Sequence, residues 1–134
     1  MTAIDPMTAY MASCACRRFV WGKWDCCLFA SDVVHLLTGH DPATGLRGAY
    51  STEEESLRVV AAHGGLRRMC IDRAHLSLVA PPYRSGDIGI ARCPRGPHAQ
   101  GYVVLWQGRF YACAPEVGLY PVHSKHVQEV YRCP

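Results

Sequence analysis

An aspartate followed by two adjacent cysteines, Asp25-Cys26-Cys27, is the part of this chain best suited to covalent chemistry. The cysteines open a strongly apolar run that predicts a helix over residues 26–38, and Asp25 is a good N-cap for that helix. Backbone N–H groups in a first helical turn lack partners, and the helix dipole favours negative charge there. A thiol at this point loses its proton more easily than an ordinary one. The sequence therefore predicts a reactive thiolate at the start of this helix.

Of the two thiols, Cys26 is favoured as the nucleophile because it belongs to the apolar stripe of the predicted helix. It shares that stripe with Phe29, Val33 and Leu37, so we expect it to face a sheet and a catalytic histidine. Cys27 is rotated by about 100° from it and stays the alternative. In a third reading both thiols are simply packed, since cysteine is among the most buried residue types.

A cysteine hydrolase also needs a histidine that takes up and returns the proton, and donors for the developing oxyanion. Among seven histidines, His98 stands just before a predicted strand and is the best candidate for the base. The other six are expected to be exposed, capping or turn residues. They are His35, His40, His63 and His75 in the helical half, and His123 and His126 near the C-terminus.

The bulk composition predicts one folded domain over residues 1–134. The chain is 49% hydrophobic and 19% charged, which is typical of a globular protein. A net charge of +3 with scattered arginines does not favour nucleic acid. The N-terminal segment does not resemble a signal peptide, and the apolar runs are too short to span a membrane. We therefore expect no membrane insertion, and synthesis in a reducing cytoplasm.

Eight cysteines in a reducing compartment need an explanation other than a disulfide framework. Several are expected to act as small buried hydrophobes. These are Cys14, Cys93, Cys113 and Cys133. The alternative is a metal or iron–sulfur site drawn from Cys14, Cys16, Cys26 and Cys27, but no standard Cys-x-x-Cys zinc spacing is present. We predict no cofactor and no metal.

The elements that must position these groups form a helical first half and a strand-rich second half. Helices are predicted over residues 6–17, 26–38, from a capping box of Ser51 and Glu54 to about residue 63, and 66–78. Strands are predicted over residues 88–92, 102–106, 109–113, 119–122 and 127–132. Gln107-Gly108 predicts a tight hairpin. This order predicts an α+β fold in which the buried helix 26–38 packs on a C-terminal antiparallel sheet.

Four features in this order resemble the NlpC-type cell-wall peptidases, a superfamily of papain-like cysteine hydrolases. They are Trp21-Gly22, Asp25-Cys26, Gly86-Asp87 before a strand, and the region from His98 to Leu105. The resemblance implies a papain-like fold, Cys26 as the nucleophile and a histidine at the start of the later strand. Peptide bonds of peptidoglycan are the substrate that it implies.

The chain departs from the superfamily pattern at the histidine. When Gly108-Arg109-Phe110 is aligned with the Gly-Lys-Phe hairpin of the superfamily, the histidine position falls on Gln100, which cannot act as a general base. His98 is two residues earlier, hence on the same side of a regular strand, and is the expected substitute. The third polar residue falls near Ala112, which has no polar side chain.

A closer resemblance covers nearly the whole chain. The segments WGKWDCCLFASD, GHDPATGLRGAYST and VGLYPV are similar to a compact family encoded in the tail gene clusters of tailed phages and prophages. The resemblance implies a tail-tip or tail-assembly protein that is made in the bacterial cytoplasm, is then part of the virion, and binds other tail proteins. Two functions stay open: a peptidase of peptidoglycan peptides, and a structural subunit without catalysis.

Two further expectations follow from individual side chains. In the structural case, apolar patches should be exposed before assembly, and the candidate aromatics are Tyr83, Tyr102, Trp106 and Tyr120. Arg47 and Tyr50, in the most distinctive stretch of the chain, are expected to have architectural roles. Arg47 would clamp carbonyls of its own loop, and Tyr50 would pack over the helix.

Overall fold

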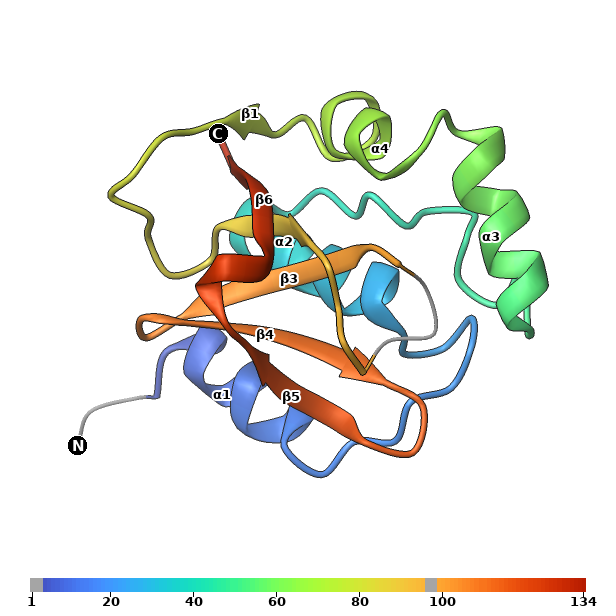
Figure 1. Ribbon diagram of the computed structural model, residues 1–134, viewed down its shortest axis with the longest axis horizontal. Coiled ribbons are helices and arrows are strands. Elements are labelled where there is room, and N and C mark those ends of the chain that lie inside the picture. Colours follow the sequence, from blue (N-terminus) through green and yellow to red (C-terminus); the bar gives the residue numbers. More distant parts are fainter. Residues whose placement is uncertain (1–3, 96–98) are drawn as a thin grey trace.

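The computed structural model describes residues 4–95 and 99–134. Within these ranges four α-helices precede the main strands of one six-stranded antiparallel sheet (Figure 1). The helices are α1 (Pro6–Cys14), α2 (Cys26–Thr38), α3 (Glu53–Ala62) and α4 (Leu66–Asp72). The strands are β1 (Ser77–Leu78), β2 (Ile88–Ala91), β3 (Gly101–Trp106), β4 (Arg109–Ala114), β5 (Gly118–Val122) and β6 (Val127–Arg132), with a 3₁₀ turn η1 (Ser124–His126) before β6. The predicted α+β class is confirmed.

The strands are arranged in the order β1-β6-β2-β3-β4-β5, so β1 and β5 lie at the two ends of the sheet. Between β3 and β4 the turn residues Gln107 and Gly108 have φ angles of 49° and 80°. Left-handed conformations at both central positions are what a two-residue hairpin of type I′ requires. The tight hairpin predicted from these two residues is therefore confirmed.

The central helix α2 begins and ends where the sequence indicates. Asp25 accepts the N–H of Leu28, and Gly39 ends the helix with a φ of 79°. Leu28, Phe29 and Val33 are fully buried, so α2 is the core helix that was expected. The last turn of the helix differs from the expectation of a buried stripe, because Leu36 and Leu37 are 40% and 47% exposed. Leu37 lies against the Gly86 turn rather than against the core.

Both faces of the sheet are buried, but by different partners. Tyr102 and Val104 of β3 belong to a core cluster that includes side chains of α1, α2 and α4. Val103 and Leu105, on the alternate positions, belong to a second cluster. Among the described residues, this second cluster is built from the strands and the segments beside them, without a helix. The start of β3 therefore lies between two apolar layers.

The boundaries of the other helices differ from the sequence expectations. α1 ends at Cys14 rather than at residue 17, and α4 ends at Asp72, before a short edge strand that the sequence did not indicate. The N-cap of α3 is Thr52, whose Oγ1 accepts the N–H of Glu55 at 3.1 Å. Glu55 Oε1 in turn accepts the N–H of Ser51 at 3.3 Å. The predicted capping box exists, shifted by one residue.

Candidate functional site

Asp25 is almost completely buried, with 1% of its surface exposed, and its carboxylate organises the start of α2. Oδ1 accepts the N–H of Leu28 at 3.0 Å. Oδ2 accepts the N–H of Gly22 at 3.0 Å and the hydroxyl of Tyr50 at 2.6 Å. A buried charge is tolerated only when donors of this kind satisfy it. Asp25 is therefore a structural N-cap whose acceptor atoms are already occupied.

The two motifs that the sequence singled out on either side of α2 pack directly on each other. Gly22 has a φ of 78°, and a Cβ at this position would lie 1.8 Å from the carbonyl oxygen of Tyr50. Gly48 donates its N–H to the carbonyl oxygen of Gly22 at 2.8 Å. The Trp21-Gly22 turn and the Arg47–Tyr50 stretch thus form one unit around Asp25. Only glycine permits so close a backbone contact at residue 22.

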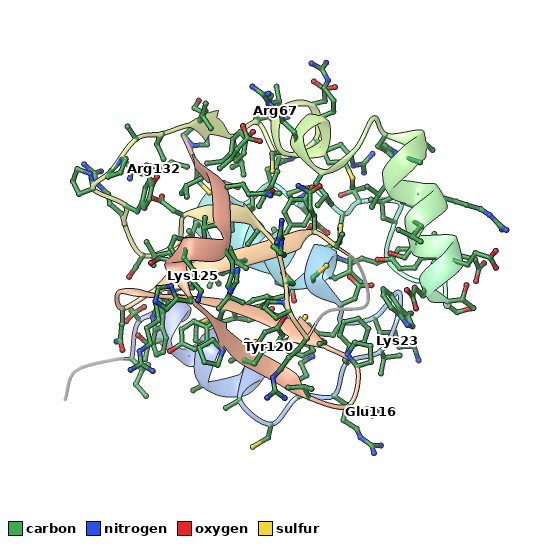
Figure 2. All side chains as sticks on the ribbon, in the orientation of Figure 1. Lys23, Arg67, Glu116, Tyr120, Lys125 and Arg132 are labelled. Carbon is green, nitrogen blue, oxygen red and sulfur yellow. The ribbon has the colours of Figure 1, made fainter. Side chains whose placement is uncertain are left out.

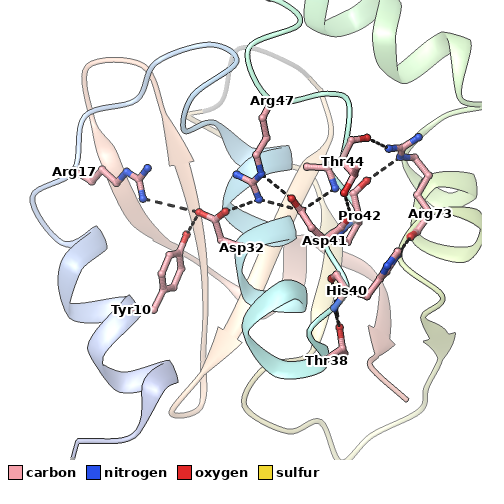
Figure 3. A network of polar contacts seen from close by, with 11 residues as sticks. Tyr10, Arg17, Asp32, Thr38, His40, Asp41, Pro42, Thr44, Arg47 and Arg73 are labelled. Atoms are coloured by element: carbon pink, nitrogen blue, oxygen red, sulfur yellow. Dashed lines mark hydrogen bonds and ion pairs between the residues drawn. The ribbon is translucent and has the colours of Figure 1, made fainter.

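Arg47 has an architectural role, but not with the partners that were expected. Its guanidinium group binds Asp41 at 3.0 and 3.1 Å and Asp32 at 2.7 Å (Figure 3). Hydrogen bonding to Arg47 lowers the pKa of Asp41. The predicted carbonyl clamp is made by Arg73 instead, which donates to the carbonyl oxygens of Pro42 at 2.8 Å and Thr44 at 2.6 Å. Arginine serves both roles because its planar fork has several donors.

The two candidate thiols point into different surroundings. Cys26 is half-buried, and its sulfur lies 3.6 Å from the place that a Cβ would take on Gly101, at the start of β3. Cys27 is buried and lines a small cavity between α2 and α4 together with Cys70 and Tyr102. This cavity, about 30 Å³, has room for a water molecule but not for a substrate. Cys26 is thus the less buried residue of the pair.

The expected lowering of the Cys26 pKa is wrong for the surroundings that the structure describes. Burial, followed by the negative charge of Asp25, raises the pKa of the Cys26 thiol to about 12. The backbone groups of Tyr102 and Cys27 oppose this rise without cancelling it. The sequence prediction rested on the helix N-terminus alone, whereas burial and the adjacent carboxylate outweigh it. At neutral pH these surroundings keep the thiol protonated.

His98, the predicted general base, lies outside the described residues. Four of the other histidines have contacts of their own. His40 and His75 stack with ring centroids 4.8 Å apart, His63 Nδ1 lies 2.8 Å from the carbonyl oxygen of Val59, and His123 caps η1. His35 lies in the last turn of α2, about 13 Å along the helix axis from Cys26. Among the described groups that most influence the Cys26 pKa, none is a histidine.

The remaining residues of the resemblance have contacts that stabilise the fold. Gln100 is exposed, and its Nε2 donates to Oε1 of Gln128 at 2.5 Å. Ala112 is buried in the second apolar cluster, so the expected third polar position is filled by packing. Asp87 is buried and binds the guanidinium of Arg132 at 2.9 and 2.8 Å (Arg132 is labelled in Figure 2). Gly86-Asp87 therefore links β2 to β6.

The structure places Cys93 near Cys26 and Tyr120 near Cys93, and the sequence indicated neither contact. The sulfur of Cys93 lies 3.2 Å from the place of a Cβ on Gly101, next to the Cys26 sulfur. Tyr120 is buried close to Cys93 and influences its pKa. No motif marks either residue. The pairing of β2 with β3 brings Cys93, which follows β2, and Gly101 to the start of α2, and Tyr120 of β5 lies close to Cys93.

Metal binding and membrane insertion find no support within residues 4–95 and 99–134. No group of three or more His, Cys, Asp or Glu side chains there is arranged to hold a metal ion. The set of Cys14, Cys16, Cys26 and Cys27 considered from the sequence is therefore not a metal site in the described part of the chain. None of the described helices has both the length and the apolar character needed to cross a bilayer.

Fold and site together define an α+β domain. A buried aspartate caps its central helix, and the first residue of that helix is a half-buried cysteine that faces the sheet. The model of one protein family, "Domain of unknown function (DUF6950)", matches residues 4–133, and the chain belongs to this family. No curated protein and no solved structure matches the chain.

Proposed function

We propose that this chain is a phage tail-tip or tail-assembly component with an NlpC-type, papain-like fold, in which Cys26 is the nucleophile for peptidoglycan peptides. The position of Cys26 carries the proposal. It is the first residue of the central helix, it is half-buried, and its sulfur lies beside the start of β3. A cysteine nucleophile needs this combination of a helix N-terminus, access and a neighbouring strand that can supply a base.

In this proposal, the Cys26 sulfur attacks the carbonyl carbon of a peptide bond and the helix N-terminus donates N–H groups to the oxyanion. His98 would take the thiol proton and pass it to the leaving amine. Asp25 does not exchange protons with the substrate, because Gly22, Leu28 and Tyr50 already bind its carboxylate. Its role is to hold the first turn of α2 in place.

The proposed partners in the virion are other tail proteins, and exposed apolar side chains are the surface available to them. Leu36, Leu37, Leu78 and Tyr83 are 40%, 47%, 57% and 37% exposed. Exposed apolar surface of this kind favours protein contacts. Two aromatics that were expected on such a surface are buried instead: Tyr102 is 4% and Tyr120 is 8% exposed. Trp106 is half-buried.

A structural subunit without turnover is the second candidate, and it is favoured by the raised pKa of Cys26, about 12. A thiol that stays protonated at neutral pH is a poor nucleophile. Gln100, which stands at the superfamily's histidine position, is engaged with Gln128, and the third position is the buried Ala112. In this case the fold would serve assembly alone.

Digestion of purified peptidoglycan fragments separates the two candidates. Wild-type protein, Cys26→Ala and the matched control Cys27→Ala are incubated with stem peptides, and the products are identified by mass spectrometry. The peptidase predicts a new peptide terminus with wild type and Cys27→Ala, and none with Cys26→Ala. No product from any of the three would support the structural subunit. If mass spectrometry of purified phage tails does not detect this chain, the assignment to the tail is contradicted.

A further inference from the structure

The sulfur atoms of Cys26 and Cys93 lie on the same side of Gly101, at the start of β3. A Cβ on Gly101 would be 3.6 Å from the Cys26 sulfur and 3.2 Å from the Cys93 sulfur. The two sulfurs are therefore within about 7 Å of each other. Because residue 101 is a glycine, it places no side chain of its own between them. Two thiols that approach each other this way are candidates for a covalent bond.

We infer that Cys26 and Cys93 form an intramolecular disulfide when the protein meets a small disulfide such as oxidised glutathione. Cys26 is then a site of reversible redox modification, and its sulfur is blocked while the bond exists. The inference does not depend on peptide hydrolysis, since it needs only the two thiols and an oxidant. If Cys26 is the nucleophile proposed above, the same bond would silence it.

The other cysteines are less suited to this reaction. Cys27 follows Cys26 in the helix but is turned about 100° away, toward Cys70. Cys113 lies in the core cluster against which Cys26 also packs, but its sulfur is not among the three atoms nearest to a Cβ on Gly101. Cys16 is exposed. Of these cysteines, Cys26 and Cys93 are the two whose sulfurs both lie against the Cα of Gly101.

The reaction proceeds in two exchanges. The Cys26 thiolate attacks one sulfur of the small disulfide, a mixed disulfide forms, and one small thiolate leaves and is protonated by solvent. The Cys93 thiolate then attacks the Cys26 sulfur, the protein disulfide forms, and the second small thiolate leaves. The two protein thiols lose two electrons and two protons in total, and the small disulfide becomes two thiols. A final sulfur separation of about 2.0 Å requires the two side chains to rotate toward each other.

Tyr120 assists the second exchange. Its hydroxyl is buried close to Cys93, and it makes no hydrogen bond of ordinary geometry with any described residue (Tyr120 is labelled in Figure 2). Burial raises the pKa of Cys93, and the Tyr120 hydroxyl opposes this rise. A donor near Cys93 stabilises the thiolate that must attack. Replacement of Tyr120 with phenylalanine should therefore slow the second exchange and leave the first unchanged.

Peptide mapping of the full chain tests the inference. Reduced protein is incubated with oxidised glutathione at about pH 9, where thiolates are more abundant, and free thiols are then alkylated. Cleavage after lysine and arginine places Cys26 with Cys27 on one peptide and puts Cys93 and Cys113 on two others. We expect the Cys26 peptide linked to the Cys93 peptide, in wild type and in Cys27→Ser alike. Cys93→Ser should instead lose the linked peptide and retain glutathione on Cys26.

The exposed Cys16 is an internal control, since it should carry glutathione in every sample. A linked peptide that joins Cys26 to Cys113, or one that disappears in Cys27→Ser, would overturn the inference. Free Cys26 and Cys93 in a wild-type sample whose Cys16 is modified would overturn it as well. In Gly101→Ala the added methyl group crowds the Cys93 sulfur, so the mixed disulfide should accumulate at the expense of the linked peptide. The wild-type mapping decides the question even where a variant folds poorly.

Discussion

The hydroxyl of Tyr50 donates a 2.6 Å hydrogen bond to the carboxylate of Asp25, and both groups are buried. This contact joins the loop that follows α2 to the residue that begins α2. The carboxylate also accepts the N–H groups of Gly22 and Leu28, so three donors converge on one charge. The first turn of α2, and with it Cys26, is held by this relationship.

Replacement of Tyr50 with phenylalanine should destabilise the protein by about 1.5–3 kcal/mol, because a buried charged acceptor loses a donor. Urea unfolding at neutral pH measures this change as a shift in the midpoint. Tyr83→Phe is the matched control: this ring is 37% exposed, so the change should stay within about 0.5 kcal/mol. Equal stability of Tyr50→Phe and wild type would show that the hydrogen bond contributes nothing.

Gly22→Ala should cost several times more stability than Gly45→Ala. Both glycines have φ near +80°, so each alanine carries a similar backbone penalty of about 1 kcal/mol. Only at Gly22 would the new Cβ also collide with the carbonyl oxygen of Tyr50, at 1.8 Å, whereas nothing lies within 4 Å at Gly45. Thermal unfolding of the two variants checks the difference. Similar losses in both would mean that the loop containing Tyr50 moves away freely.

Asp25→Asn should make Cys26 more reactive toward alkylating agents. Asparagine still caps a helix, but it removes the negative charge that, after burial, contributes most to the raised pKa of Cys26. The thiolate fraction at a given pH then increases, and the alkylation rate should rise several-fold. Rates are measured in a Cys16→Ser background, with Asp72→Asn as a surface control. A rate unchanged from wild type would exclude the Asp25 charge as a cause.

Alkaline solution should destabilise the fold through its buried thiols. Burial raises the pKa of Cys26 and of Cys70 to about 12, whereas an unfolded cysteine titrates near 8.5. Between these values the unfolded chain has released the proton and the folded chain has not, so the free energy of unfolding falls as pH rises. The stabilisation is complete below pH about 8.5 and is lost toward pH 12. Each thiol contributes a slope of up to about 1.4 kcal/mol per pH unit.

Cys70→Ser checks this linkage, since serine does not titrate in the same range. Urea unfolding at several pH values between 8 and 11 should give a shallower slope for Cys70→Ser than for wild type, whatever the offset in stability. Cys16→Ser is the control, because Cys16 is exposed. Parallel slopes for Cys70→Ser and wild type would remove buried thiols as the cause.

Much of the fold could be predicted because local signals agree with the tertiary structure. The Asp25 cap, the apolar run after it and Gly39 together predict α2 at its observed bounds. Short alternating segments predict β2 to β6 to within a residue or two. Where two neighbouring residues can both cap a helix, the predicted start can be wrong by one residue. This is the case for α3, where Ser51 was predicted as the N-cap and Thr52 is observed. Two-residue strands such as β1 have no periodicity to recognise.

The site could be predicted only in part, because its chemistry depends on long-range contacts. The sequence indicated Cys26 and its helix N-terminus, but not the burial and the Asp25 charge that raise its pKa. Gly22 and Tyr50, which are far apart in the chain, both donate hydrogen bonds to the carboxylate of Asp25. Local sequence patterns do not indicate such a contact. Cys93, which follows β2, comes near Cys26 because β2 pairs with β3, and a single sequence does not reveal which strands pair.

The two ends of the sheet have a consequence for how copies of this chain can meet. β1 is only two residues long, and β5, at the other end, contains Pro121, which has no N–H to donate. Short or proline-containing outer strands are poor templates for a further strand. Edge-to-edge strand pairing between copies, which can lead to fibres, is therefore disfavoured at both edges of the sheet. Copies of this chain that meet would therefore recognise one another through side chains rather than through backbone pairing.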